Sequence, residues 1–169
     1  MRVDSVGAEK GGSPGFDQTD ESPKLRAWLA FLTSYRMVMD RLEEELEAER
    51  GLALTWFDVL AQLARAGGRL RMNQLAASLV LSKSGLTRRI DRMERAGYVA
   101  RESSCSDRRG AYAVLTEAGR EALEAAQPVH LTGIREHFSR YLSDAEARTL
   151  EKALGLIADA ATRPPDKAC

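Results

Sequence analysis

The stretch that decides the fold is LSKSGLTRRIDRMERAGYVAR, residues 81–101. Ser82 is a residue type that caps helices, and apolar residues then recur with helical spacing until Gly97, a residue type that often ends them. The apolar positions are Leu86, Ile90 and Met93. The pattern therefore predicts an amphipathic helix over residues 82–96.

Two shorter helical patterns precede this helix, at residues 55–66 and 72–79. After it, residues 98–101 and 111–115 are rich in β-type residues and bracket a turn of Ser, Asp and Gly, which is typical of a hairpin. The order helix, helix, tight turn, helix and hairpin predicts a mostly α (α+β) winged helix-turn-helix fold.

Positive charge is concentrated in the same part of the chain. The whole protein has a formal net charge of zero, but residues 69–101 hold eight basic and two acidic residues. Residues 40–50, by contrast, hold six acidic residues and two arginines. This separation indicates a local anion-binding surface on an otherwise neutral protein.

The chemistry of the helix over 82–96 suits DNA, because the major groove admits one helix whose first residues reach base edges. The residues expected to do so are Ser82, Lys83, Ser84, Gly85, Thr87 and Arg88. Arg92 shares a side with Arg88, opposite the apolar positions, and Arg71 belongs to the same basic segment, so we expect both to contact DNA. The alternative is an ordinary solvated helix face. The concentration of charge on one helix and its hairpin favours DNA binding.

The turn of the hairpin carries Asp107, Arg108, Arg109 and Gly110 in succession. Arginine is attracted to narrow, A·T-rich minor grooves. The hairpin tip is therefore expected to enter the minor groove next to the major groove that holds the helix over 82–96, the recognition helix. Asp107 would orient Arg109 or the turn amides, and Gly110 would let the turn close. A charged turn that only keeps the protein soluble is the alternative.

Residues 24–50 carry apolar side chains at alternating intervals of three and four, which predicts one long amphipathic helix. The stripe consists of Leu25, Trp28, Leu32, Tyr35, Met39, Leu42 and Leu46. Such a helix is about 40 Å long, which exceeds what a core of this size covers. We therefore expect a partner helix, such as that of a second subunit.

The two ends of the chain are expected to be tails. Residues 1–22 have few large apolar side chains and an excess of acids, which predicts a disordered acidic tail. Helical patterns fill residues 116–163, and the last helix opens on a capping box formed by Ser143 and Glu146. Its inward residues are expected to be Leu150, Leu154 and Ile157. Two prolines end it, and 164–169 form a short tail.

Three segments together resemble the MarR family of bacterial transcriptional regulators. They are LTWFDVLAQLA (54–64), LAASLVLSKSGLTRRIDRMERAGYVAR (75–101) and SDRRGAYAVLTEAGREALE (106–124). The resemblance implies a homodimer held through residues 23–50 and 116–163, with a DNA-binding lobe at 55–115 of each copy. It also implies a pseudo-palindromic operator, repression as the usual mode of action, and Arg109 as the wing arginine supported by Asp107.

The same resemblance implies release from DNA by a small aromatic or phenolic acid, an oxidant or a metal, with the ligand pocket between the dimer helices and the lobe. The residues expected to line this site are Trp28, Tyr35, Trp56, Asp58 and Arg89. Aromatic walls with an acid and an arginine suit a planar, weakly acidic molecule. The alternative is that Trp28 and Tyr35 form dimer core and that Asp58, three residues after Thr55, completes a helix-capping box.

Other classes of function have little support in the sequence. A Gly-rich phosphate loop and a recognisable serine, histidine and acid set are missing, so no enzyme is expected. His130 and His137 share a helix face without further convincing ligands, so we expect no metal and no cofactor. Cys105 and Cys169 have no disulfide or metal pattern. Neither a membrane span nor a secretory signal is visible, which makes the cytoplasm the expected location.

The main alternative function is an architectural DNA-binding protein without an effector, because such a protein would share every motif described above.

Overall fold

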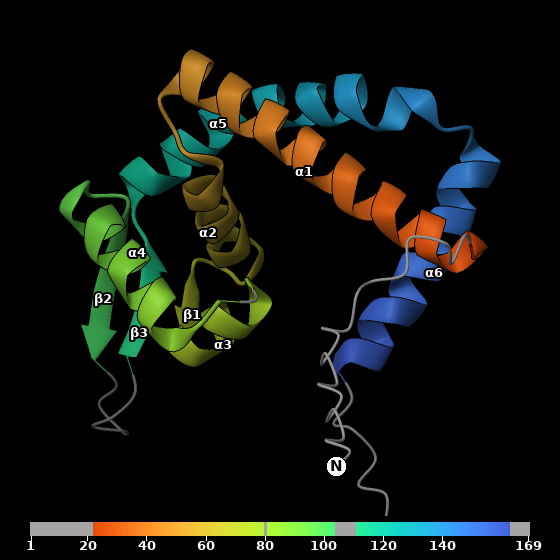
Figure 1. The fold of residues 1–169 in the computed structure, drawn as a ribbon. Coiled ribbons are helices and arrows are strands. Elements are labelled where there is room, and N and C mark those ends of the chain that lie inside the picture. Colours follow the sequence, from red (N-terminus) through yellow and green to blue (C-terminus); the bar gives the residue numbers. More distant parts are fainter. Residues whose placement is uncertain (1–21, 80, 104–110, 163–169) are drawn as a thin grey trace, which may run out of the picture. The chain divides into compact units, whose positions relative to one another are not determined.

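The computed structural model describes residues 22–79, 81–103 and 111–162 (Figure 1). The expected acidic tail up to residue 21, the hairpin tip at 104–110 and the expected C-terminal tail therefore lie outside the described residues. The chain divides into two compact units, residues 1–36 and 37–169.

The long helix expected over 24–50 is present as α1 (Pro23–Arg50), and its first half belongs to the smaller unit. Three aromatic rings follow one another there. The centroids of Trp28 and Phe31 are 6.0 Å apart, and those of Phe31 and Tyr35 are 6.2 Å apart. These side chains are 53%, 41% and 57% exposed, whereas Leu42 further along the same stripe is buried. The apolar stripe of α1 therefore includes exposed aromatic side chains as well as buried leucine.

The larger unit contains the winged helix-turn-helix, which confirms the predicted fold class (Figure 1). Its helices are α2 (Leu54–Arg65), α3 (Met72–Ser78) and α4 (Lys83–Arg95). Its strands are β1 (Arg69–Arg71), β2 (Val99–Ser103) and β3 (Ala111–Leu115), which form an antiparallel sheet in the order β1-β3-β2. The largest fully buried side chains are Leu46, Leu60, Leu63, Leu75, Leu86, Ile90, Met93, Val59 and Val99. All three predicted apolar positions of α4 belong to this core.

The exit from β3 joins three elements through two small residues. Thr116 caps α5 (Glu117–His137), because its hydroxyl oxygen accepts the Gly119 N–H at 3.0 Å. The same hydroxyl donates to the Gly97 carbonyl at 2.7 Å, directly after α4. A Cβ at position 119 would collide with the Tyr98 carbonyl oxygen, so only glycine fits there. Thr116 and Gly119 thus tie the end of α4 and the start of β2 to the start of α5.

The predicted start of α2 was wrong. The helix begins at Leu54 rather than Thr55, and its N-cap, Ala53, provides no side-chain hydrogen bond. A distant residue supplies the cap instead, since the Leu54 N–H donates to Glu43 Oε2 at 2.9 Å. Asp58 therefore lies inside the helix, and the capping role considered for it is excluded. The third strand, β1, was also missed.

The chain continues through α5, the short 3-10 helix η1 (Ser139–Tyr141) and α6 (Asp144–Thr162). The predicted capping box of the last helix is confirmed, because Glu146 Oε2 accepts the Ser143 N–H at 2.9 Å and its hydroxyl at 2.6 Å. The expected inward position of Ile157 was wrong for the single chain, where this side chain is 64% exposed. Within the described ranges, no helix is both long and apolar enough to span a membrane.

Candidate DNA-binding surface

The first turn of α4 is exposed and is held in place by its own hydroxyl groups. Ser82 Oγ accepts the Gly85 N–H at 3.1 Å and lies 3.3 Å from Ser84 Oγ. Thr87 Oγ1 donates to the Lys83 carbonyl at 2.8 Å. A Cβ on Gly85 would lie 3.0 Å from Ser82 Oγ, so glycine leaves this cap undisturbed. The cap fixes the end of the helix from which contacts to base edges are expected.

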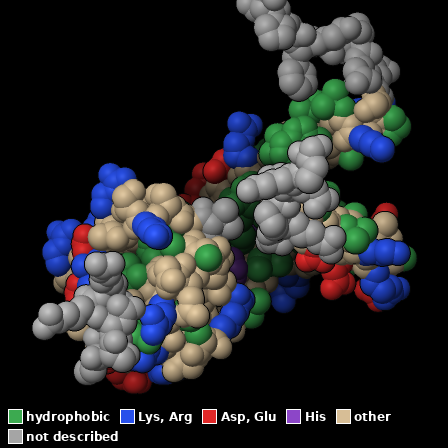
Figure 2. Space-filling view, turned by 90° about the horizontal axis from the view of Figure 1, so that it is seen from below, with side chains coloured by type: hydrophobic (Ala, Val, Ile, Leu, Met, Phe, Trp, Pro, Cys, Tyr) green, Lys and Arg blue, Asp and Glu red, His purple; other side chains and the backbone are tan. Residues whose placement is uncertain are grey.

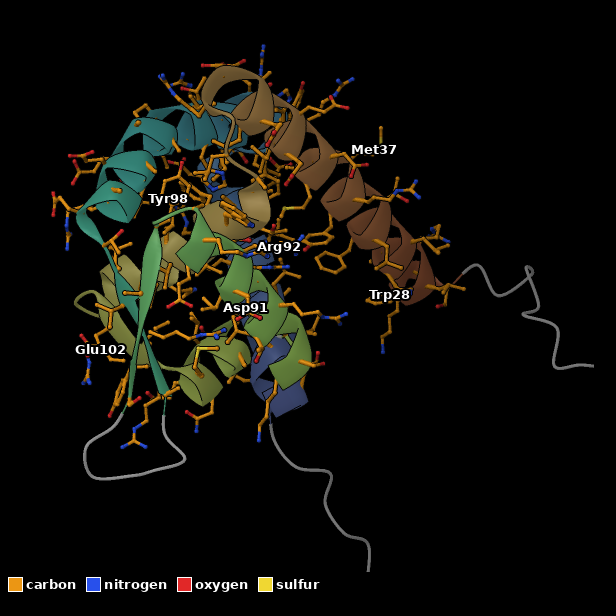
Figure 3. The ribbon with its side chains drawn as sticks, turned by 90° about the vertical axis from the view of Figure 1, so that its left-hand side faces the viewer. Trp28, Met37, Asp91, Arg92, Tyr98 and Glu102 are labelled. Carbon is orange, nitrogen blue, oxygen red and sulfur yellow. The ribbon has the colours of Figure 1, made fainter. Side chains whose placement is uncertain are left out.

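The cationic side chains of α4 point away from the core, as predicted. Lys83, Arg88, Arg92 and Arg95 are exposed, while Arg89 is half-buried. Figure 2 shows Lys and Arg side chains gathered around the lobe, and Figure 3 shows Arg92 beside Asp91 on α4. The other predicted contacts of this helix, Ser82, Ser84 and Thr87, are also exposed, and Gly85 is half-buried. The predicted base and phosphate contacts of this helix are therefore accessible to solvent, and their contact with DNA stays a prediction.

Arg71, predicted from its charge alone, lies on the sheet rather than on α4. It pairs with Tyr112 of β3, which also pairs with Glu102 of β2. The Arg71 guanidinium carbon is 5.3 Å from the Tyr112 ring centroid, and that of Arg69 is 3.6 Å from it. Arg69 Nε is also 3.0 Å from Glu102 Oε2. This stacking holds two arginines against β3, one residue pair before the last described pair of the hairpin, Ser103 and Ala111.

The predicted hairpin-tip contacts, Asp107, Arg108 and Arg109, lie outside the described residues. The ribbon that leads to them is described up to the pairing of Ser103 with Ala111. Their role stays a prediction of the sequence.

A model of the MarR family matches residues 50–110. The crystal structure of AbsC, a MarR family transcriptional regulator from Streptomyces coelicolor, is 38% identical in sequence to this chain, with a TM-score of 0.78. The match covers 83% of this chain and 95% of AbsC. The chain belongs to the MarR family.

Other MarR-family and helix-turn-helix regulators agree with this assignment. Sco3205 from Streptomyces coelicolor, whose structure was solved in complex with DNA, is 26% identical with a TM-score of 0.79, over 86% of this chain and 95% of Sco3205. The transcriptional regulator PecS of Dickeya dadantii is 29% identical over 128 residues, which are 75% of this chain and 76% of PecS. The relatives are named as transcriptional regulators, and this MarR-family chain belongs to the same class of DNA-binding regulators.

Within the lobe of this MarR-family protein, three of the five predicted effector residues come from adjoining elements. Asp58 and Trp56 lie on α2, and Arg89 of α4 reaches α2, where its NH1 donates to the Thr55 carbonyl at 3.3 Å. Trp56 packs edge-on against Tyr98, with ring centroids 5.9 Å apart. The remaining two, Trp28 and Tyr35, belong to the smaller unit and stay predictions.

Asp58 is half-buried, and charged groups on other helices act on its carboxyl. Burial raises the pKa of the Asp58 carboxyl above its ordinary value, and Glu43 raises it further, whereas His130, Arg89 and Arg65 lower it. We call Asp58, Arg89 and His130 the Asp58 cluster. Its members belong to α2, α4 and α5 and comprise an acid, an arginine and an imidazole that interact electrostatically with Asp58 at the centre.

Sequence reasoning missed the part of His130 in this cluster. Its ring lies 4.4 Å from the Phe57 ring, between centroids, and its Nδ1 is buried with no hydrogen-bond partner among the described residues. Burial lowers the pKa of the His130 imidazole, and Asp58 acts in the opposite direction. No local signal predicts this arrangement, because it depends on packing between helices far apart in the sequence.

His137, which was considered together with His130, contacts a different partner. Its Nε2 lies 2.5 Å from Glu45 Oε1 on α1. In the part of the chain that the structure describes, no three His, Cys, Asp or Glu side chains are grouped to hold a metal ion.

Proposed function

We propose that this protein is a sequence-specific repressor that binds a pseudo-palindromic operator as a homodimer. The observation that carries the proposal is the exposed first turn of α4, where Lys83, Ser84 and Arg88 project from a helix whose opposite face is buried. A helix of this kind fits the major groove. The DNA complex of the relative Sco3205 supports duplex DNA as the ligand.

The proposal extends to the hairpin that follows α4. Arg109, supported by Asp107, enters the minor groove beside the recognition helix, and Arg108 contacts the backbone. Arg69 and Arg71 stack on Tyr112 near the end of the ribbon that leads to the tip, which supports a path of the hairpin along the phosphates.

The proposed homodimer is supported by apolar side chains that the single chain leaves exposed. They are Trp28, Leu29, Phe31, Leu32, Tyr35, Met37, Leu131, Phe138, Tyr141, Leu156 and Ile157. An apolar groove of about 480 Å³ also runs along α6, between Leu142 and Ala153. Exposed apolar surface of this extent marks an interface, and we infer that a second copy covers it. The two lobes would then meet half-sites about 10 base pairs apart.

The proposed effector is a small, planar, weakly acidic aromatic molecule held at the Asp58 cluster. Arg89 would receive its negative charge, since the positively charged guanidinium reaches from α4 to α2, where it donates to the Thr55 carbonyl at 3.3 Å. His130 Nδ1 and Asp58 would exchange hydrogen bonds with its polar edge, and Trp56 would form an apolar wall. A ligand that binds Arg89 would also act on the position of α4, because Arg89 belongs to that helix.

The DNA-binding proposal is tested by fluorescence anisotropy on DNA from upstream of the protein's own gene, at two salt concentrations, against a scrambled duplex of equal length. Selective binding at the higher salt concentration supports a specific regulator. Equal loss on both duplexes would favour the alternative, an architectural protein whose attraction to DNA is purely electrostatic.

The effector proposal is tested by thermal unfolding with a panel of aromatic acids, since a ligand of the native state raises Tm. Arg89→Met and Asp58→Asn serve as site variants. We expect at least one acid to raise Tm and to release the operator, and we expect both effects to disappear in Arg89→Met. An acid that still acts on this variant binds elsewhere.

A further inference from the structure

Arg101 of β2 reaches across to the recognition helix α4 and contacts three residues there. Its NH2 lies 2.5 Å from Asp91 Oδ1 and donates to the Thr87 carbonyl at 3.2 Å. Its Nε lies 3.9 Å from Glu94 Oε2, and its backbone N–H donates to Glu94 Oε1 at 3.2 Å. Thr87, Asp91 and Glu94 follow one another at intervals of four and three, so they lie on one side of α4.

The next residue anchors β2 on the opposite side of the sheet. Successive side chains of a strand point to opposite faces, and Glu102 pairs with Arg69 of β1 at 3.0 Å. Figure 3 shows Glu102 on the hairpin, apart from Asp91 on α4. The strand is therefore held to α4 by Arg101 and to β1 by Glu102, two residues before the segment that leads into the hairpin tip.

The contact also accounts for the two acids of the recognition helix. Asp91 and Glu94 are the only acids among residues 69–101, and a carboxylate close to DNA repels phosphate. Arg101 pairs with both, so the positive charge of Arg88, Arg92 and Arg95 on the neighbouring side of α4 is less opposed. Arg101 is one of the eight basic residues in 69–101, but its positive charge is paired with acids of the lobe itself.

Arginine suits this joint better than lysine would. Its planar guanidinium presents donors in a fixed fork, so one group serves a carboxylate and a carbonyl at once, whereas lysine offers a point charge on a flexible stem. The Arg101 side chain is 32% exposed and those of Asp91 and Glu94 are 43% and 41% exposed. Ion pairs this exposed add little to the stability of a fold. The value of the contact therefore lies in geometry.

We propose that Arg101 is a positioning residue for DNA recognition, which fixes the hairpin against the recognition helix without touching DNA. A recognition helix and a hairpin held at one angle engage two grooves as a single body. Without the contact between Arg101 and α4, the hairpin must be ordered each time the protein binds DNA, which costs conformational entropy. The contact of the hairpin with DNA then adds less to the affinity. The inference rests on the DNA-binding function proposed above.

The central test compares DNA affinity in variants that break the contact from each side. Arg101→Met should weaken operator binding roughly 5–20-fold, while the slope of log affinity against log salt stays at the wild-type value. Arg101→Lys should recover only part of the loss. A slope that falls by about one would make Arg101 a phosphate contact and overturn the proposal.

Asp91→Asn/Glu94→Gln separates geometry from charge. This double variant removes two negative charges beside DNA, so electrostatics alone predicts tighter binding. The proposal predicts binding roughly 3–10-fold weaker, because both carboxylates that hold Arg101 are lost. Tighter or unchanged binding would overturn it. Arg120→Met is the matched control, since it removes an arginine that pairs with Glu117 within α5 and not with the acids of α4.

A coupling measurement asks whether the effect passes through the hairpin. In an Arg109→Ala background, where the proposed minor-groove contact is already lost, Arg101→Met should cost less than about threefold. A full additional loss would show that Arg101 acts on something other than the hairpin tip and would overturn the proposal.

Hydrogen exchange of the DNA-free protein tests the contact between Arg101 and α4 without depending on the choice of operator. Amides of β2 should exchange faster in Asp91→Asn/Glu94→Gln than in wild type or Arg120→Met, at equal Tm. Unchanged exchange would overturn the proposal even if the wild-type protein binds its operator selectively. Failure of the wild-type protein to select its operator, with faster exchange in the variant, would instead count against the proposed function alone.

Discussion

At the scale of single residues, position 119 is decided by one carbonyl oxygen. A side chain at Gly119 would collide with the Tyr98 oxygen, and the Gly119 N–H is already bonded to Thr116. A helix would otherwise favour alanine over glycine, so packing here overrides intrinsic propensity. Position 155 of α6 offers the opposite case, because a Cβ there meets nothing within 4 Å.

Gly119→Ala should therefore destabilise the protein by about 1–3 kcal/mol, since the start of α5 must move away from β2. Gly155→Ala, the same change in an open helical position, should stabilise it by about 0.5–1 kcal/mol. Urea denaturation of both variants measures the difference. Equal effects of the two substitutions would mean that α5 and the Tyr98 turn are not packed as described.

His130 links stability to pH. Burial lowers its folded-state pKa below the ordinary value near 6.5, so the folded protein prefers the neutral ring. Its contribution is fully present above the unfolded-state pKa and is lost as the pH falls through and below 6.5. Asp58 acts in the opposite sense, because a raised folded-state pKa means that the folded protein favours the protonated acid.

His130→Gln should therefore reduce the loss of stability between pH 7.5 and pH 5.5. The measurement is the free energy of unfolding of both proteins at both pH values. An equal or larger loss in the variant would contradict the burial of the His130 ring against Phe57.

At the scale of elements, the parts set by local signals were predictable and the parts set by distant contacts were not. Ser82, Thr116 and Ser143 cap their helices within a few residues, and the sequence marks each of them. The cap of α2 comes from Glu43 on another helix, and the short strand β1 exists only because it pairs with β3. The candidate site divides in the same way. The exposed face of α4 follows from helical periodicity, whereas Arg101 and His130 acquire their partners only on folding.

The exposed face of α4 gives an element-scale prediction. Arg92→Ala should weaken operator binding and lower the salt slope by about one, because a phosphate contact releases counterions. Arg41→Ala is the control, as it removes an exposed arginine paired with Glu44 on α1, outside the lobe. An Arg92 variant with wild-type affinity and slope would remove this residue from the contact surface.

At the scale of the whole molecule, the net charge hides the basic lobe, and burial in a single chain leaves apolar side chains exposed that a second chain would cover. A formal charge of zero conceals a basic lobe next to an acidic stretch of α1. Likewise, a chain with a well-packed lobe still exposes Leu32 of α1 and Ile157 of α6. Water-exposed leucine and isoleucine on otherwise regular helices are explained if the functional molecule contains two chains.

Leu32→Glu/Ile157→Glu should convert the proposed dimer into a folded monomer, because buried charge without a partner is costly at an interface but tolerated in water. Light scattering gives the mass, and circular dichroism shows whether the helices persist. Ala48→Glu, at an exposed position of α1 outside the apolar stripe, should leave the mass unchanged.

The monomer should bind a half-site duplex nearly as well as the parent protein does. It should lose most of its affinity for the full operator, since the second lobe no longer binds at high effective concentration. A double variant that keeps the parent mass would place the interface elsewhere, and a parent protein that is itself monomeric would rule out the proposed homodimer.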